Sequence, residues 1–264
     1  KWQTRALAVE MLRELINLNL KDKDSVEVTK SPILFKVGEL IRIAFTASTS
    51  SVIELRLLGV QLLNDILVSL RDVEDPDFKE VSLLEQYQAQ IGSALTPAFS
   101  GDTSPELAAQ AIGVCATFIG AGIIKNVDRM GRILKLLTSA LESCSAKAIT
   151  LGDLKTLSPN AQVMLKMAVL SSWAELQIAS TSPDYSMLEE VVKPYISSLI
   201  PLWLTSLREF AQLRFEPEQS SSLSIGGSSM DYMYSALSRN SVLPFYQRSW
   251  IQLVDAIASL IEVD

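Results

Sequence analysis

Residues 83–124, LLEQYQAQIGSALTPAFSGDTSPELAAQAIGVCATFIGAGII, decide the fold, because they contain one complete helix-turn-helix unit. Their first half predicts a helix over 84–99, since apolar side chains recur at helical spacing and a proline falls in the last turn. The Ser-Gly-Asp that follows interrupts this helix. A second helix then begins, because Ser104 is a good N-cap, Pro105 suits the first helical position and Glu106 complements the helix dipole.

The second helix of this unit, predicted over 105–124, is apolar nearly all round and must therefore be buried on several sides. Its small residues let neighbouring backbones approach closely, which suits the inner layer of a stacked array: Ala108, Ala109, Ala111, Gly113, Ala116 and Gly120. A membrane span is the alternative, because the segment is about the minimum length for crossing a bilayer. Ala and Gly contribute little transfer energy and no aromatic belt flanks the segment, so the sequence favours a buried helix.

Similar helical patterns occupy most of the rest of the chain. Further helices are predicted over 2–18, 32–47, 51–70, 127–143, 160–179, 187–213, 231–238 and 243–262. The helix over 187–213 is expected to bend at its two prolines. Loops are predicted over 21–30, 72–77, 152–159 and 216–229. The last of these is Ser-rich and is expected to be a mobile connector, with phosphorylation of its serines as the alternative role.

Two of these helices carry more specific predictions. In the helix over 2–18, Arg13 and Glu14 are expected to point outward and one apolar stripe to face the core: Leu7, Met11, Leu12, Leu15 and Leu18. At the start of the helix over 51–70, Ser51 and Glu54 match the spacing of a capping box.

The helices repeat in register along the chain. The segments 2–5, 54–56 and 246–248 each end in an arginine, precede an apolar run, and are expected to open a second helix in the same way. The early units are spaced by about fifty residues, slightly above the HEAT or armadillo period, and long polar inserts explain the excess. The predicted fold class is therefore all-α, an α-solenoid of stacked antiparallel helix pairs (HEAT repeats). Residues 1–264 are expected to form one solenoid segment with a flexible loop at 216–229.

Composition and charge exclude several classes of protein. The chain of 264 residues is 48% hydrophobic, so it has ample material to bury a core. Its net charge is -7 and its pI is near 4.8. These values argue against a nucleic-acid binder, which would carry a concentrated positive field. No charged leader with a short apolar region opens the chain, so no secretory signal is expected. Because both ends fall in or beside helical patterns, we expect a segment of a longer protein.

The residues that are absent from the sequence argue against catalysis. There are no histidines, which removes Ser-His-Asp and Cys-His nucleophile activation and imidazole zinc sites. Cys115 lies in mid-helix among apolar residues and Cys144 near a helix end, and both are expected to be reduced, buried thiols, which fits a cytosolic setting. No phosphate-binding glycine loop or metal-ligand spacing is present. We therefore expect no enzymatic activity, no cofactor and no metal site.

One basic helix face is the candidate binding site. Lys125, Arg129, Arg132 and Lys135 follow one another at helical spacing, opposite the apolar side of the helix over 127–143. Such a face could receive an acidic peptide or a lipid head group. A solvated helix face is the simpler interpretation, because charged helix faces usually serve solubility.

Three stretches also resemble a particular family. Residues 84–122, with LRLLGVQLLNDIL at 55–67 and WQTR at 2–5, resemble the very long HEAT-repeat accessory proteins of the clathrin adaptor of the trans-Golgi network and endosomes. The similarity is best over 1–141. After that it is carried by the helix over 166–178, which contains Trp-Ala-Glu at 173–175.

The resemblance implies a non-enzymatic cytosolic scaffold that associates peripherally with membranes. It implies a role in recruiting or localising adaptor protein complex 1, together with smaller, largely disordered accessory subunits. Self-association is left open. The alternative function is that of a HEAT solenoid in another pathway, such as a nuclear transport receptor or a phosphatase scaffold. The identity of the bound partner discriminates between the two.

Overall fold

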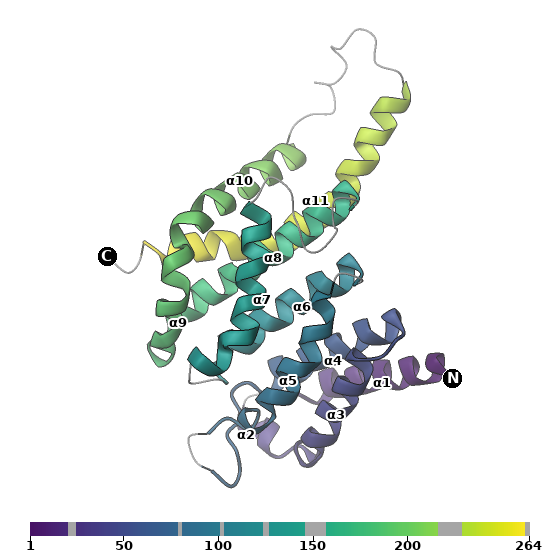
Figure 1. The fold of residues 1–264 in the computed structure, drawn as a ribbon, viewed down its shortest axis with the longest axis vertical. Coiled ribbons are helices and arrows are strands. Elements are labelled where there is room, and N and C mark those ends of the chain that lie inside the picture. Colours follow the sequence, from purple (N-terminus) through teal and green to yellow (C-terminus); the bar gives the residue numbers. More distant parts are fainter. Residues whose placement is uncertain are drawn as a thin grey trace.

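A computed structural model describes residues 1–20, 25–78, 81–100, 103–123, 127–145, 157–215 and 229–261. They form two layers of helices, which advance from α1 and α3 at one end to α10 and α11 at the other (Figure 1). The first layer contains α1 (Trp2–Leu20), α4 (Ile53–Leu70), α6 (Pro105–Gly120), α8 (Pro159–Ser180) and α11 (Ser229–Ser259). The second layer contains α3 (Val37–Ser48), α5 (Gln88–Leu95), α7 (Val127–Ser145), α9 (Ser186–Val192) and α10 (Ile196–Phe215).

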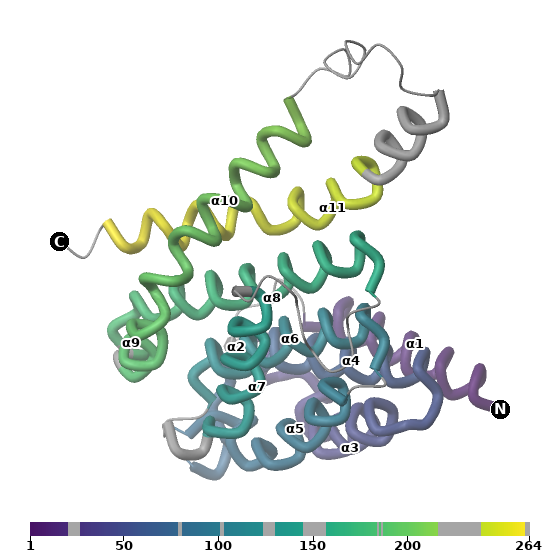
Figure 2. Tube along the Cα trace, turned by 45° about the horizontal axis from the view of Figure 1, so that its top comes forward, coloured from purple at the N-terminus to yellow at the C-terminus, as the bar shows by residue number. Residues whose placement is uncertain are grey.

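Successive helices of the first layer pack side by side. α1 contacts α4, α4 contacts α6, α6 contacts α8, and α8 contacts α11 (Figure 2). In the second layer α3 packs against α4 and α5, and α10 packs against α11. Each helix pair therefore covers an apolar face of its neighbour, which is how a solenoid buries a continuous core. The predicted all-α solenoid is confirmed: among the described residues, the one β pairing is an isolated bridge between Glu74 and Ser82.

The central unit follows the sequence prediction at the start of α6 and departs from it at the end. Ser104 Oγ accepts a hydrogen bond from the Leu107 backbone amide at 3.3 Å, so the predicted N-cap is confirmed. α6 ends at Gly120 and does not continue to 124. The reason is Gly122, which adopts a positive φ of 64° and turns the chain away from the helix.

The first helix of the unit is divided into three pieces. The stretch predicted as one helix over 84–99 consists of η2 (Glu85–Tyr87), α5 and η3 (Thr96–Phe99). Pro97 lies in η3, where it cannot donate the hydrogen bond that would continue α5. The helical nature of the stretch is as predicted, but its continuity is not.

Several other boundaries differ from the prediction. α2 (Ser25–Thr29) occupies part of the loop predicted over 21–30, and Pro159 begins α8, with Ser158 as its N-cap. The predicted helix over 187–213 is interrupted at Pro194 by η6 (Lys193–Tyr195). The loop predicted over 216–229 lies outside the described residues up to 228, as does most of 152–159. Ser229 is already the first residue of α11.

α11 is one helix where two were predicted. It runs through Pro244, so residues 246–248 lie inside it and do not open a helix, contrary to the repeat register. Val242 and Tyr246 are buried on either side of the proline. Their packing against the rest of the molecule offsets the hydrogen bond that Pro244 removes.

α1 faces the core with a different stripe from the one predicted. Val9, Ile16 and Leu20 are buried. The predicted stripe is largely exposed: Leu7, Met11, Leu15 and Leu18 lie on the surface and Leu12 is half-buried. Arg13, predicted to point outward, instead pairs with Asp65 of α4, with 2.7 Å between Nε and Oδ2. α1 is apolar on two sides, and this ion pair belongs to the side that meets α4.

The predicted capping box of α4 is also wrong. The helix starts at Ile53, and the N-cap position is occupied by Val52, which makes no side-chain cap. Ser50 Oγ instead accepts a hydrogen bond from the Val52 amide at 3.2 Å. The register of the start is shifted, so Glu54 lies in the first turn too early to complete the box.

The core is continuous, and its largest side chains come from α6, α8 and α10. Phe118, Trp173 and Trp203 are fully buried. The indole nitrogen of Trp173 donates to the Leu137 carbonyl oxygen at 3.4 Å, and that of Trp203 donates to the Leu170 carbonyl oxygen at 3.1 Å. The two indoles thus join α8 to α7 and α10 to α8. Among the described helices, none has both the length and the hydropathy needed to cross a bilayer.

Candidate partner-binding surfaces

The structure tests the predicted basic face only in part. Arg132 and Lys135 lie on α7, and both are exposed. Ile133 is buried on the opposite side of the same helix. Lys125 lies outside the described residues, and Arg129 belongs to α7 but its side chain is not described. The structure therefore brings Arg132 and Lys135 to one exposed face, and the four-residue basic face stays a prediction.

A pocket that the sequence did not suggest lies where three helices of the first layer end. Its volume is about 330 Å³. Arg71 follows the last residue of α4, Thr117 and Gly120 belong to the last turns of α6, and Glu175 and Ile178 belong to the last turns of α8. Because the first-layer helices run parallel, their C-terminal ends converge here. The pocket is a product of the stacking itself.

Glu175 is the half-buried carboxylate of this pocket. Its Oε1 accepts a hydrogen bond from Thr117 Oγ1 at 3.1 Å, across the contact between α6 and α8. Burial raises the pKa of Glu175, while the Thr117 hydrogen bond and the positive charge of Arg71 act in the opposite direction. Arg71 pairs with Asp72 at 3.2 Å, and both of these side chains are largely exposed. Glu175 is therefore the charge held inside the pocket.

Tyr185 forms one wall of the pocket because of Gly122. An added Cβ at Gly122 would lie 1.8 Å from Cε1 of Tyr185, so only glycine lets the ring lie against this turn. Tyr185, in η5 (Pro183–Tyr185), also donates from its hydroxyl to the Ala121 carbonyl oxygen at 3.4 Å. Gly122 thus ends α6 through its positive φ and, because it has no Cβ, leaves room for the Tyr185 ring in the pocket lining.

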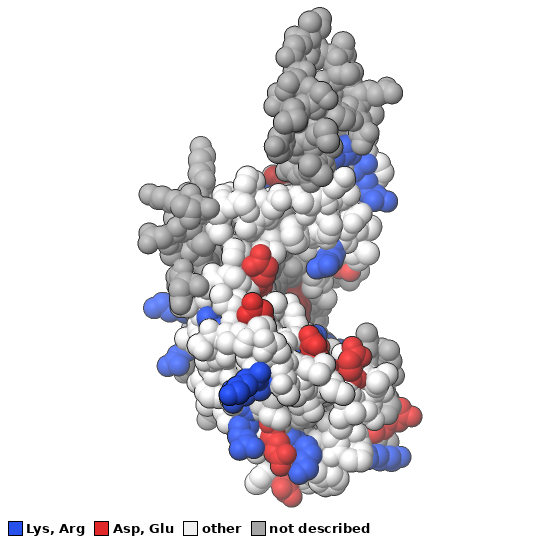
Figure 3. All heavy atoms as spheres, turned by 90° about the vertical axis from the view of Figure 1, so that its right-hand side faces the viewer, with Lys and Arg blue, Asp and Glu red and all other residues white. Residues whose placement is uncertain are grey.

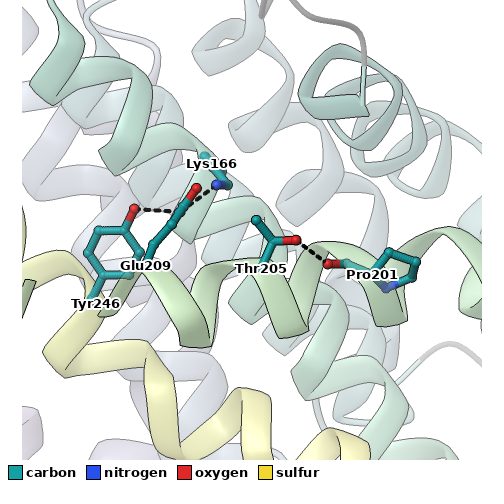
Figure 4. A network of polar contacts seen from close by, with 5 residues as sticks. All are labelled: Lys166, Pro201, Thr205, Glu209 and Tyr246. Atoms are coloured by element: carbon teal, nitrogen blue, oxygen red, sulfur yellow. Dashed lines mark hydrogen bonds and ion pairs between the residues drawn. The ribbon is translucent and has the colours of Figure 1, made fainter. Parts of the chain in front are cut away.

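A second polar cluster joins three helices at the other side of α8. Glu209 Oε2 lies 2.7 Å from Lys166 Nζ and accepts a hydrogen bond from the Tyr246 hydroxyl at 2.8 Å (Figure 4). These residues belong to α10, α8 and α11. Burial raises the pKa of Tyr246, and its hydrogen bond to Glu209 raises it further. Each of the three side chains has a partner within the cluster, so the cluster acts as a structural connection between helices.

The two cysteines are free thiols in surroundings that keep them protonated. Burial raises the pKa of Cys115, and it raises the pKa of Cys144 to about 11, so both free thiols are protonated near neutral pH. In the ranges that the structure describes, no group of three His, Cys, Asp or Glu residues is placed to hold a metal ion.

Acidic and basic side chains are interspersed on the face shown in Figure 3, which is hollowed near its middle.

The sequence contained only an indirect signal for the Glu175 pocket. Glu175 is the one carboxylate between residues 160 and 180, in a helix with many apolar side chains, where a charged group has to be accommodated. Its partner Thr117 is 58 residues away and looks like an ordinary interruption of an apolar helix. No spacing rule connects the two residues, because their proximity depends on how α6 and α8 stack.

The two-layer stack of helix pairs, in which each pair packs against the next, defines an α-solenoid of the HEAT type. The chain belongs to the Laa1/Sip1/HEATR5 HEAT repeat region family, whose family model matches residues 33–212. The resemblance drawn from the sequence is thereby confirmed.

Two relatives show how far the similarity extends. The chain is 29% identical over its whole length to AP-1 accessory protein LAA1 of Saccharomyces cerevisiae, and it covers 13% of that protein. It is also 34% identical to Protein SWEETIE of Arabidopsis thaliana over 111 residues. These residues are 41% of this chain and 5% of that protein. No solved structure matches the chain. The chain thus corresponds to a small part of each relative's length.

Proposed function

We propose that this chain acts as part of a non-enzymatic trafficking scaffold, which helps to recruit or localise adaptor protein complex 1 at the trans-Golgi network and endosomes. The observation that carries the proposal is the similarity, along the entire chain, to a yeast protein named for its accessory role with AP-1. Because the chain corresponds to 13% of that relative, the proposal concerns a contribution to a larger activity.

The proposed mechanism is binding by extended surfaces. Residues 1–264 act as one continuous solenoid segment, whose long exterior contacts the adaptor complex and smaller, largely disordered accessory subunits. Association with membranes is peripheral and is mediated by these partners on the cytosolic side. A solenoid supplies many weak contacts along one face, which suits the capture of extended, flexible segments.

The basic face of α7 is the proposed contact for an acidic partner. The predicted face comprises Lys125, Arg129, Arg132 and Lys135, of which the structure describes Arg132 and Lys135 as exposed on α7. In a chain of net charge -7, a local basic surface favours an acidic peptide segment or an anionic head group. Arginine adds bidentate pairing with carboxylates, which lysine cannot provide.

A pull-down tests both parts of the proposal. The immobilised 264-residue chain is incubated with cytosol, and the adaptor complex 1 subunits retained are quantified. We expect retention by the unaltered chain and a clear loss in the double variant Arg132→Glu, Lys135→Glu. The matched control is Lys193→Glu, Arg208→Glu, which reverses two charges that are also exposed, in η6 and α10.

The outcomes separate the function from the site. Equal retention by both double variants leaves the adaptor function in place and removes the α7 face from it. Retention of transport receptors or a phosphatase catalytic subunit, with no adaptor subunits, would assign the chain to another pathway.

A further inference from the structure

The pocket at the C-terminal ends of α4, α6 and α8 has a chemistry that differs from the basic face of α7. We propose that it is a binding site for one Lys or Arg side chain of a partner peptide, whose cationic group pairs with Glu175 while its methylene stem lies along the apolar wall. The inference is independent of which partner the proposed function requires.

The charges of the lining favour a cation. Its charged residues are Arg71, Asp72 and Glu175, so its net charge is negative. Arg71 and Asp72 pair with each other at the rim, and this leaves Glu175 as the interior charge. Among the described residues Thr117 is the one hydrogen-bond donor to the carboxylate, and it binds Oε1. Glu175 Oε2 is therefore able to accept a hydrogen bond from a ligand.

The helix ends act in the same direction. α4, α6 and α8 present their C-terminal turns to the pocket, and the C-terminal end of a helix carries partial negative charge. A phosphate or carboxylate entering here would meet three negative helix ends and the Glu175 carboxylate. An ammonium or guanidinium group would be attracted by all four. The pocket therefore favours a cationic occupant over an anionic one.

The walls fit a long side chain with a charged end. Gly120, Ile178 and Ala179 supply apolar surface, and the ring of Tyr185 closes one side. Lysine and arginine bury their methylene stems along such surfaces while their charged ends stay in polar surroundings. A cation within about 6 Å of an aromatic ring gains further attraction. At about 330 Å³ the pocket lies at the small end of ligand sites, roughly 300–1,000 Å³.

A metal ion is a poorer occupant than a basic side chain. Metal sites for hard cations need about six oxygen ligands. The pocket offers two carboxylates, Glu175 and Asp72, besides neutral oxygens, and Asp72 is already paired with Arg71. The described residues contain no metal-binding cluster at this place. One carboxylate with an adjacent aromatic wall is instead sufficient for a single guanidinium or ammonium group.

The test uses two small probes that differ only in charge. N-acetyl-Gly-Arg-Gly-amide and its neutral citrulline counterpart are titrated into the isotope-labelled 264-residue chain, and amide chemical shifts are followed by NMR. The expected result is saturable shifts at Thr117, Gly120 and Ala121 with the arginine probe and none with citrulline. Glu175→Gln should weaken binding about tenfold or more, because a charge-assisted hydrogen bond is lost.

Two further variants keep the test decisive. Arg71→Gln should tighten binding of the arginine probe, because it removes the cation that competes for Glu175. Glu190→Gln, which neutralises an exposed carboxylate of α9, is the control and should leave probe binding unchanged. The proposal is overturned by equal binding of the citrulline probe, by shifts located elsewhere, by no binding at millimolar probe, or by a Glu175→Gln variant that binds normally. Probe binding without adaptor retention would keep this site and remove the proposed function.

Discussion

The guanidinium group of Arg56 donates a hydrogen bond of 2.6 Å from Nη2 to the carbonyl oxygen of Pro97, across 41 residues of sequence. Arg56 is 9% exposed and lies in the first turns of α4. Pro97 lies in η3, which directly follows the second-layer helix α5. Arg56, near the start of the first-layer helix α4, is thus held by Pro97, which follows the second-layer helix α5. The hydrogen bond joins two repeats.

We predict that Arg56→Met destabilises the chain by about 1.5–3 kcal/mol, because it removes a buried hydrogen bond made by a charged donor. Urea denaturation measures the change. Arg5→Met is the matched control, since Arg5 opens α1 in the same sequence pattern but is exposed. A similar loss of stability in the two variants would show that the bond to Pro97 contributes nothing specific.

The three arginines show what sequence could and could not give. Arg5, Arg56 and Arg248 have similar neighbours along the chain, and the repeat class could be predicted from them. Only Arg56 is buried beside the next unit, whereas Arg248 is exposed in the middle of α11. The pattern identifies the repeat, but the contact depends on which helices become neighbours. The Glu175 pocket was missed for the same reason.

The second prediction concerns the face of α1. Ile16→Ala should cost about 2–4 kcal/mol, because Ile16 is 1% exposed and its truncation leaves a cavity against the rest of the core. Leu18→Ala should change stability by less than about 0.5 kcal/mol, because Leu18 is 78% exposed. Thermal unfolding followed by circular dichroism compares the two. The reverse order of the two variants would restore the stripe that the sequence predicted.

The third prediction tests the central layer. Phe118→Ala should destabilise the chain by about 3–5 kcal/mol, because the ring is fully buried in α6 between neighbouring repeats. Glu74→Ala should be nearly silent, because Glu74 is exposed in the turn after α4. Equal unfolding midpoints for the two variants in urea would be inconsistent with stacked repeats that share one core.

The fourth prediction concerns alkaline pH. Folding raises the pKa of Tyr246 above its usual 10, so its stabilising effect is complete below pH 10 and is lost as the pH rises above that value. Tyr246→Phe should therefore be less stable than the unaltered chain at pH 7, by about 1 kcal/mol for the lost hydrogen bond to Glu209. The difference should shrink above pH 10.

Urea unfolding at pH 7, 9, 10 and 11 measures this difference. The two free thiols are present in both proteins, so their ionisation cancels in the comparison. A stability difference that stays constant over the whole range would mean that the hydroxyl of Tyr246 titrates as it does in the unfolded chain.

The fifth prediction is that burial of the Glu175 carboxylate lowers the stability of the fold at neutral pH. Folding raises the pKa of Glu175 above its usual 4.5, because burial penalises the carboxylate. For an acid with a raised pKa, the favourable contribution is present below 4.5 and is lost as the pH rises through the folded value. At pH 7, above the usual 4.5, the burial of Glu175 therefore costs stability relative to acidic pH. Glu175→Gln keeps an oxygen that accepts from Thr117 and removes the charge, so it should raise the unfolding midpoint.

The gain from Glu175→Gln should disappear as the pH falls below 4.5, where Glu175 is protonated in both the folded and the unfolded chain. Thermal unfolding at pH 7 and pH 4, with Glu190→Gln as the exposed control, measures this dependence. A stabilised variant that no longer binds the arginine probe would mean that the charge of Glu175 is retained for binding at the expense of the fold. A destabilised variant would instead make Glu175 a structural partner of Thr117, because a residue held for stability does not improve the fold when its charge is removed.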